Sequence, residues 1–116
     1  MNDRIALVIG NSDYIYVNKL NNPRNDANDI ECVLSSLNFD VRKVTDTNLI
    51  DLQQAVNTFL KELDEYAVGL LFYAGHGMQI DGKNYIVPVD LEMCDKSKTI
   101  VSCYSVNSFL DGVSSY

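Results

Sequence analysis

The chain has 116 residues, of which 47% are apolar, so its length and composition suit one folded domain or part of one. Its 9 basic and 16 acidic residues give a net charge of -7, without a Lys/Arg cluster. This balance excludes nucleic acid and anionic membranes as expected partners. No apolar run has the length of a membrane span, and the polar start is unlike a signal peptide. Three dispersed cysteines indicate neither a disulfide framework nor a zinc site, so we expect a reducing, cytoplasmic location.

The first predicted elements are a strand, a long loop, a helix and a second strand. Arg4–Gly10 is a short apolar run rich in β-branched residues, typical of a strand buried on both faces. A polar loop follows over Asn11–Asn22, and loops of this length inside a domain are often functional. The next helix has Asn22 as its expected cap and Asn38 as its expected stop. Phe39–Val44 then alternates apolar and polar residues, which predicts a strand near a sheet edge.

The middle of the chain repeats this alternation. Asn48–Tyr66 has apolar residues at helical spacing, with Asn48 at the N-terminus, and predicts an amphipathic helix. Val68–Ala74 predicts another buried strand. A hairpin with its turn at Asp81–Gly82 should follow, because this dipeptide favours a tight two-residue turn.

The last part of the chain predicts a polar loop over Leu91–Thr99 and a further helix over Tyr104–Tyr116. The resulting order alternates strands and helices, which indicates an α/β fold with a mostly parallel sheet and helices on its faces.

His76 is the only histidine of the chain and lies between Gly75 and Gly77, directly after the predicted strand Val68–Ala74. In open α/β sheets, ligands bind beyond the carboxyl ends of the strands. An imidazole titrates near neutrality, which suits a general base. From this pattern alone, a catalytic histidine and an ordinary histidine at a turn are equally supported.

Aspartates occur in the loop and helix that follow the first predicted strand. Asp26 lies in the first turn of the helix, where a carboxylate favours the helix dipole, and this structural role is the better supported one. Asp13 and Asp29 are more simply interpreted as solvated charges.

The three cysteines are possible nucleophiles, because Cys–His pairs are common in catalysis. Cys32 lies within a helix as an expected core residue, Cys94 lies in a loop, and Cys103 lies at the start of the last helix. Neither Cys94 nor Cys103 follows a strand, so none of the three is favoured as a catalytic thiol. No nucleotide-binding glycine motif and no metal-ligand cluster is present, so we expect neither a cofactor nor a metal.

The segments "RIALVIGNSDY" and "GLLFYAGHGMQIDGKNYIVPVD" together resemble the caspase-like peptidase family, and the resemblance extends from about Arg4 to Leu110. Within the family the sequence is more similar to paracaspases and bacterial orthocaspases than to metacaspases. The resemblance implies a three-layer αβα sandwich and a cysteine endopeptidase.

The resemblance also implies roles for single residues. His76 would be the base of a His–Cys dyad, and the N–H of Gly77 would contribute to the oxyanion hole. Asp26 would line the S1 pocket and pair with a P1 Arg or Lys of a peptide substrate.

One departure from the family concerns the nucleophile. The family's cysteine follows the histidine by about 50 residues in a "DxC" segment, and this count from His76 passes Tyr116. We therefore expect residues 1–116 to be a partial, large-subunit type caspase-like domain that ends before the nucleophile strand and is inactive alone. A degenerate gene is the other explanation. The expected partners are a substrate with a basic P1 residue and the remainder of the catalytic domain, with a possible dimer in the full-length protein. A non-catalytic caspase-like binding or signalling module is the alternative function, which the retained His76 and Gly77 disfavour.

Overall fold

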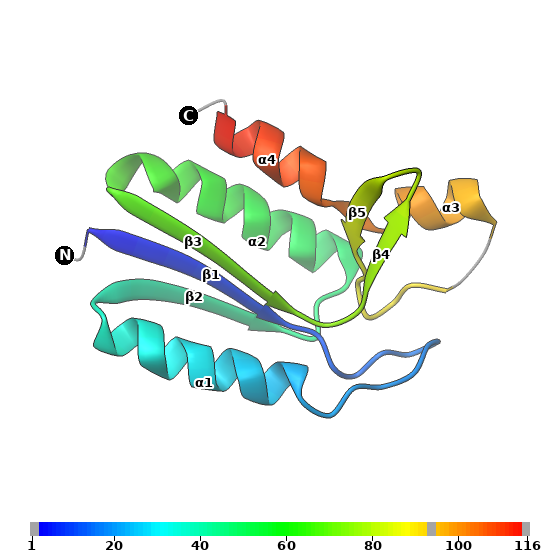
Figure 1. Cartoon of the computed structure of the whole chain (residues 1–116), viewed down its shortest axis with the longest axis horizontal. Helices are drawn as coiled ribbons and strands as arrows, with labels where there is room; N and C mark the ends of the chain where they lie inside the picture. The colour runs from blue at the N-terminus through cyan, green and yellow to red at the C-terminus, as the bar shows by residue number, and fades with distance from the viewer. Residues whose placement is uncertain (1–2, 93–94, 115–116) are drawn as a thin grey trace.

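The computed structural model describes residues 3–92 and 95–114 and contains a central three-stranded parallel sheet (Figure 1). Strand β1 (Arg4–Gly10) is the middle strand, with β2 (Phe39–Thr45) on one side and β3 (Val68–Ala74) on the other. The three strands begin level and end level, because Arg4 pairs with Phe39 and with Val68. Their carboxyl ends therefore form one common edge.

Helices cover both faces of this sheet, as the sequence predicts for a three-layer αβα sandwich. On one face, Ile5, Leu7 and Ile9 of β1 pack against α2 (Leu49–Glu62). On the other face, Ala6 and Val8 pack against α1 (Pro23–Ser36). Because successive side chains of a strand point to opposite faces, β1 needs apolar residues throughout, and Ile5 to Ile9 are at most 1% exposed.

Strand β3 is less buried than the sequence predicts. No residue of Val68–Ala74 is fully buried, and the side chain of Val68 is 46% exposed. Within the described part of the chain, β3 pairs with β1 alone, so its second edge has no strand beside it. The apolar pattern identifies a strand but does not report how many neighbours the strand has.

The two long helices start differently. The side chain of Asn48 accepts a hydrogen bond from the N–H of Asp51 at 2.8 Å and caps α2, as predicted. Asn22 precedes α1 with helical backbone angles, and its side chain makes no capping bond, so the predicted cap is wrong.

The helix ends also differ in part from the prediction. Asn38 has a φ of 64°, the left-handed conformation expected of a residue that stops a helix, so this prediction for α1 is confirmed. Helix α2 ends at Glu62, before the predicted end at Tyr66. A separate 3-10 turn follows over Leu63–Glu65.

The predicted hairpin is confirmed. Strand β4 (Gly77–Ile80) pairs antiparallel with β5 (Lys83–Ile86) around the turn at Asp81 and Gly82. Both turn residues have positive φ, 52° and 77°, which matches the twist of the flanking strands.

The segment after the hairpin differs from the prediction. A short helix α3 occupies Lys96–Val101, where the sequence indicated a loop up to Thr99, because Asp95 accepts a hydrogen bond from the N–H of Lys98 and caps it. Tyr104–Ser105 form strand β6, which pairs with β5, so the last helix α4 (Val106–Ser114) begins later than predicted. Tyr104 and Ser105 are extended because they pair with the edge of β5 that β4 does not occupy.

Among the described residues, no helix is both long enough and apolar enough to cross a membrane. Within the same residues, no three side chains of His, Cys, Asp or Glu are grouped to hold a metal ion.

The two asparagines at the helix starts provide a matched test of the fold. Replacing Asn48 with Ala should lower the free energy of unfolding by about 1 kcal/mol, because one amide of α2 loses its acceptor. Asn22→Ala should change it by less than about 0.5 kcal/mol, because no capping bond is lost. Urea unfolding of both variants measures the difference, and equal losses would contradict the assigned caps.

Candidate active site

The loops after β1 and β3 share the carboxyl edge of the sheet, as predicted from their order. Gly10 and Ala74 are paired at the ends of the two strands, and the N–H of Asn11 donates to the carbonyl of Ala74 at 2.9 Å. The loop with Asn11 and the loop with His76 therefore leave the sheet side by side.

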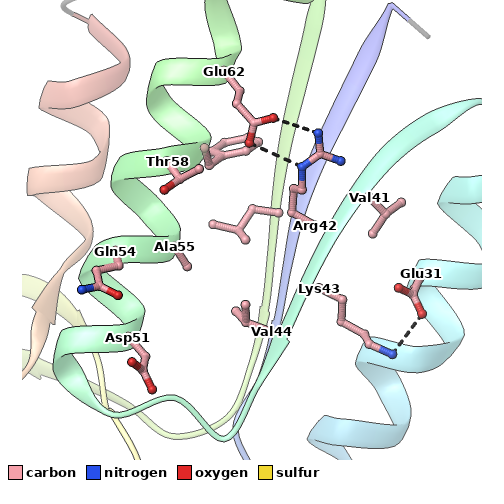
Figure 2. A pocket seen from close by; sticks show the side chains of 12 residues that line it. Glu31, Val41, Arg42, Lys43, Val44, Asp51, Gln54, Ala55, Thr58 and Glu62 are labelled. Atoms are coloured by element: carbon pink, nitrogen blue, oxygen red, sulfur yellow. Dashed lines mark hydrogen bonds and ion pairs between the residues drawn. The ribbon is translucent and has the colours of Figure 1, made fainter. Parts of the chain in front are cut away.

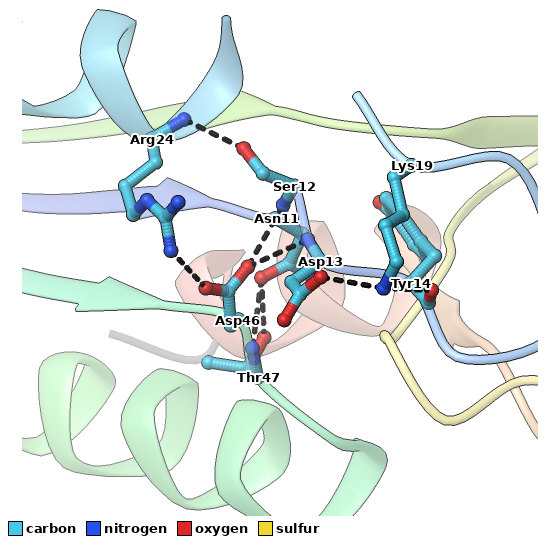
Figure 3. Close-up of polar contacts among 8 residues, drawn as sticks. All are labelled: Asn11, Ser12, Asp13, Tyr14, Lys19, Arg24, Asp46 and Thr47. Atoms are coloured by element: carbon cyan, nitrogen blue, oxygen red, sulfur yellow. Dashed lines mark hydrogen bonds and ion pairs between the residues drawn. The ribbon is translucent and has the colours of Figure 1, made fainter. Parts of the chain in front are cut away.

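The side chain of Asn11 joins a third segment to this edge (Figure 3). Its Oδ1 accepts hydrogen bonds from the N–H of Thr47 at 2.9 Å and from Thr47 Oγ1 at 3.1 Å. Asn11 is 0% exposed and Thr47 is 3% exposed. A buried amide without these partners would be costly, so the pairing holds the loop between β2 and α2 against the end of β1.

Asp46 fixes the base of the loop after β1 in a similar way. Its Oδ1 accepts from the N–H groups of Ser12 and Asp13, both at 2.9 Å, and its Oδ2 pairs with Arg24 Nη1 at 3.1 Å. Asp13 itself is exposed and pairs with Lys19, and the bond with Lys19 lowers the pKa of Asp13. Asp13 is therefore a solvated ion-pair residue, as the sequence indicates, and Asp46 is a structural residue that the sequence reasoning missed.

His76 is half-buried at the end of β3, and its ring is held by the long loop. Its Nε2 lies 2.8 Å from the backbone carbonyl oxygen of Asn18. A carbonyl oxygen can only accept, so Nε2 carries the proton of the neutral imidazole and donates it. The other nitrogen, Nδ1, then has the free lone pair, and no described residue hydrogen bonds to it. A base needs this lone pair.

Two tyrosine hydroxyls hold the backbone of His76. The N–H of His76 donates to Tyr14 Oη at 2.8 Å, and Tyr73 Oη donates to the carbonyl of His76 at 2.7 Å. The two hydroxyl oxygens are 3.2 Å apart. With the proton of Tyr73 on the His76 carbonyl, the proton of Tyr14 has two acceptors within reach, Tyr73 Oη and the Val87 carbonyl oxygen at 3.3 Å.

The two hydroxyl groups leave no room for a side chain at Gly75, so a glycine is required there. Its φ is 152°, and a Cβ at this position would lie 2.5 Å from Tyr73 Oη and 2.7 Å from Tyr14 Oη. A Cβ at Gly77 would meet only the carbonyl of Tyr85, at 3.5 Å, which is an ordinary contact. The glycine before His76 thus has a steric reason in the described structure, whereas the glycine after it does not.

A pocket of about 190 Å³ lies beside the imidazole. It is lined by Val17, Asn18, His76, Gly77, Met78, Val87 and Leu91. Apart from the histidine, none of these described residues is ionisable, so the pocket offers apolar surface next to the base. The sequence reasoning singled out only two of the lining residues, because the others come from three separate segments.

Asp26 does not line this pocket. It lies in the first turn of α1, is exposed, and no described residue forms a hydrogen bond or ion pair with its carboxylate. Helix α1 starts at the same edge of the sheet as His76, because Pro23 packs directly on Gly10 at the end of β1. A Cβ at Gly10 would lie 2.5 Å from the carbonyl oxygen of Pro23.

A larger pocket, of about 660 Å³, lies elsewhere and shares no lining residue with the pocket at His76 (Figure 2). It runs along β2 between α1 and α2. Its basic side chains are already paired, Arg42 with Glu62 at 2.8 Å and Lys43 with Glu31 at 3.0 Å. It therefore does not add to the site at the carboxyl edge.

The described cysteines do not pair with His76. Cys103 is 7% exposed in an apolar cluster between α3 and β6, and burial raises the pKa of its thiol. Cys32 is exposed on α1, so the expectation that it is a core residue is wrong, and Cys94 lies outside the described residues. A buried thiol with a raised pKa is a poor nucleophile, because the thiolate is the reactive form.

These features define an α/β sandwich with a histidine-bearing site at the carboxyl edge of its parallel sheet. The sequence profile of the caspase domain family matches residues 3–112, and the chain belongs to this family. The resemblance to caspase-like peptidases is thereby confirmed.

Two curated relatives are similar to this chain. Human (Homo sapiens) mucosa-associated lymphoid tissue lymphoma translocation protein 1 is 40% identical over 88 residues, which are 76% of this chain and 11% of that protein. Its mouse (Mus musculus) homolog has the same identity and coverage. The chain therefore spans about a tenth of the length of the curated relatives that it matches.

The two glycines that flank His76 allow a second test. Gly75→Ala should lower the free energy of unfolding by about 2 to 4 kcal/mol, because it adds backbone strain and a clash with two hydroxyls. Gly77→Ala should change it by less than about 0.5 kcal/mol, because its Cβ has room. Chemical unfolding measures both, and an equal tolerance of alanine would show that the hydroxyls do not lie where the structure has them.

Proposed function

We propose that this chain is the histidine-bearing part of a cysteine endopeptidase that cleaves peptide bonds after Arg or Lys. The observation that carries the proposal is the state of His76. Its Nε2 proton is held by the Asn18 carbonyl, and Nδ1 is left as a base beside a pocket at the carboxyl edge of the sheet. Membership of the caspase domain family supports a protease-type function.

In the proposed reaction, His76 Nδ1 takes the proton of a cysteine thiol, and the thiolate adds to the carbonyl carbon of the scissile bond. The N–H of Gly77 donates to the oxyanion that forms. The imidazolium then protonates the leaving amine, and the C–N bond breaks to give a thioester. Water, losing a proton to Nδ1, attacks the thioester carbon; the C–S bond breaks, the acid is released, and the imidazolium returns its proton to the leaving thiolate. The bond from Nε2 to Asn18 remains in place during each proton transfer.

Asp26 is the proposed partner of the basic P1 side chain. Its carboxylate is exposed at the start of α1, on the sheet edge that carries His76, and is not engaged by another described residue. A guanidinium can form two parallel hydrogen bonds with a carboxylate, which favours Arg over neutral side chains.

The nucleophile is proposed to come from outside residues 1–116. Of the two cysteines described, Cys103 is buried with a raised pKa and Cys32 is on the outer surface of α1. Residues 1–116 would then form a partial catalytic domain that needs its remainder, in a cytoplasmic protein that can dimerise at full length. The free thiols are compatible with a reducing compartment.

The first test compares the 116-residue chain with a longer chain that adds a "DxC" segment after Tyr116. The longer chain should hydrolyse fluorogenic peptides with P1 Arg, and His76→Ala should reduce kcat/KM by at least about 100-fold. The 116-residue chain should show no thiol-dependent turnover. Turnover by the short chain that Cys103→Ala abolishes would contradict the proposed origin of the nucleophile, and an inactive longer chain that still binds peptides would support a non-catalytic module.

A second test in the same longer chain concerns specificity. Asp26→Ala should lower kcat/KM for P1 Arg by about 30-fold or more, because the substrate cation loses its partner. Asp29→Ala is the matched control, since Asp29 is also an exposed acid on α1, and its effect should stay within about twofold. Equal effects of the two substitutions would show that only net charge matters and would remove Asp26 from the site.

A further inference from the structure

We propose that Tyr14 is a positioning residue for His76, and that it acts with Tyr73 through a closed ring of hydrogen bonds around the His76 peptide units. The relevance to catalysis rests on the proposed function, but the positioning itself does not. The ring runs from the His76 N–H to Tyr14, from Tyr14 to Tyr73, and from Tyr73 to the His76 carbonyl.

The two hydroxyls connect the N–H of His76 with its carbonyl oxygen. Each tyrosine proton has an acceptor: Tyr73 Oη donates to the His76 carbonyl, and Tyr14 Oη lies within hydrogen-bond distance of Tyr73 Oη and of the Val87 carbonyl. Hydrogen bonds arranged in this manner polarise one another, and the effect is stronger away from water. Tyr14 is 1% exposed, and burial raises the pKa of both tyrosines, so both hydroxyls stay protonated and able to donate.

Tyr14 also contacts the imidazole itself. The two rings have centroids 4.5 Å apart and are tilted by 58°. One face of the imidazole is therefore occupied by the Tyr14 ring, while Nε2 is held by Asn18 O. Together these contacts define the position and the rotation of the His76 side chain.

Tyr14 and Asn18 belong to the same loop. Backbone hydrogen bonds hold this loop at Ile15, between the two residues, and at Leu20, after Asn18. The N–H of Ile15 donates to the Val89 carbonyl at 3.0 Å, and the N–H of Leu20 donates to the Ser12 carbonyl at 2.9 Å. A change at Tyr14 is thus transmitted to the Asn18 carbonyl through a short, fixed segment. Gly75 supports the same inference, because any side chain there would occupy the space of the two hydroxyls.

The test uses the 116-residue chain, because its single histidine gives one unambiguous imidazole in NMR spectra. The unsubstituted chain should show the Nε2-protonated tautomer and cross-relaxation between the His76 and Tyr14 rings. In Tyr14→Phe, which keeps the ring and removes the hydroxyl, exchange of the Nε2 proton with water should become roughly 10-fold faster. The reason is that His76 loses its backbone acceptor and separates more often from Asn18.

Tyr73→Phe should change the same signals in the same direction, because it opens the ring at its other member. Tyr85→Phe is the matched control: Tyr85 is buried in the same apolar cluster as Tyr14, and its hydroxyl makes no hydrogen bond with His76. Its imidazole signals should match those of the unsubstituted chain. A merely structural tyrosine would lower the unfolding midpoint and leave the imidazole of the folded protein unchanged.

The outcomes separate this inference from the proposed function. Imidazole exchange and cross-relaxation that stay unchanged in both Tyr14→Phe and Tyr73→Phe would overturn it, as would equal changes in Tyr85→Phe. If Tyr14→Phe fails to fold, Tyr73→Phe decides. In a longer chain that is active, Tyr14→Phe should lower kcat about 10-fold with KM unchanged. A longer chain without activity would contradict the proposed function, while the NMR result would still decide the role of Tyr14.

Discussion

The arrangement of the site at His76 depends on the hydrogen bonds of one buried residue, Asn11. Its backbone N–H is bound to the end of β3, and its side chain binds Thr47 in the loop that leads to α2. Both partners lie at the carboxyl edge, where three parallel strands end level. Because these groups are out of contact with water, breaking one bond would leave a buried polar group without a partner. The loop that carries Tyr14 and Asn18 therefore leaves the sheet in one direction only.

From that fixed point, three segments converge on one imidazole. Strand β3 supplies Tyr73 and leads directly into His76, the loop after β1 supplies Tyr14 and Asn18, and the hairpin supplies part of the adjoining pocket. The contacts of His76 with Tyr14 and with Asn18 are each 2.8 Å long; the one at Tyr14 is partly buried, and the one at Asn18 lies at the surface. The tautomer of His76 follows from this convergence, since the Asn18 carbonyl oxygen can only accept a hydrogen bond, and Nε2 must donate it.

Much of the fold could be predicted from the sequence, and the failures have physical reasons. A continuous apolar run located β1, apolar residues at helical spacing located α2, and the Asp81–Gly82 dipeptide located the hairpin. These patterns could not show that β3 has a single neighbour, or that Tyr104 joins β5 as a strand. Those features depend on which strand edges lie next to one another in the folded chain. The absence of a capping bond at Asn22 likewise depends on its backbone angles, which its residue type does not determine.

The sequence by itself determined the fold class, the family and the position of its single histidine after a strand. It also placed Gly75 beside this histidine, but not the two hydroxyls that leave no room for a side chain there. Only the tertiary structure decided which atoms surround His76, because Tyr14 and Asn18 lie 62 and 58 positions away along the chain. No periodicity or local motif records contacts at such separations. They follow from the parallel order of β1 and β3, which places the ends of two distant segments together.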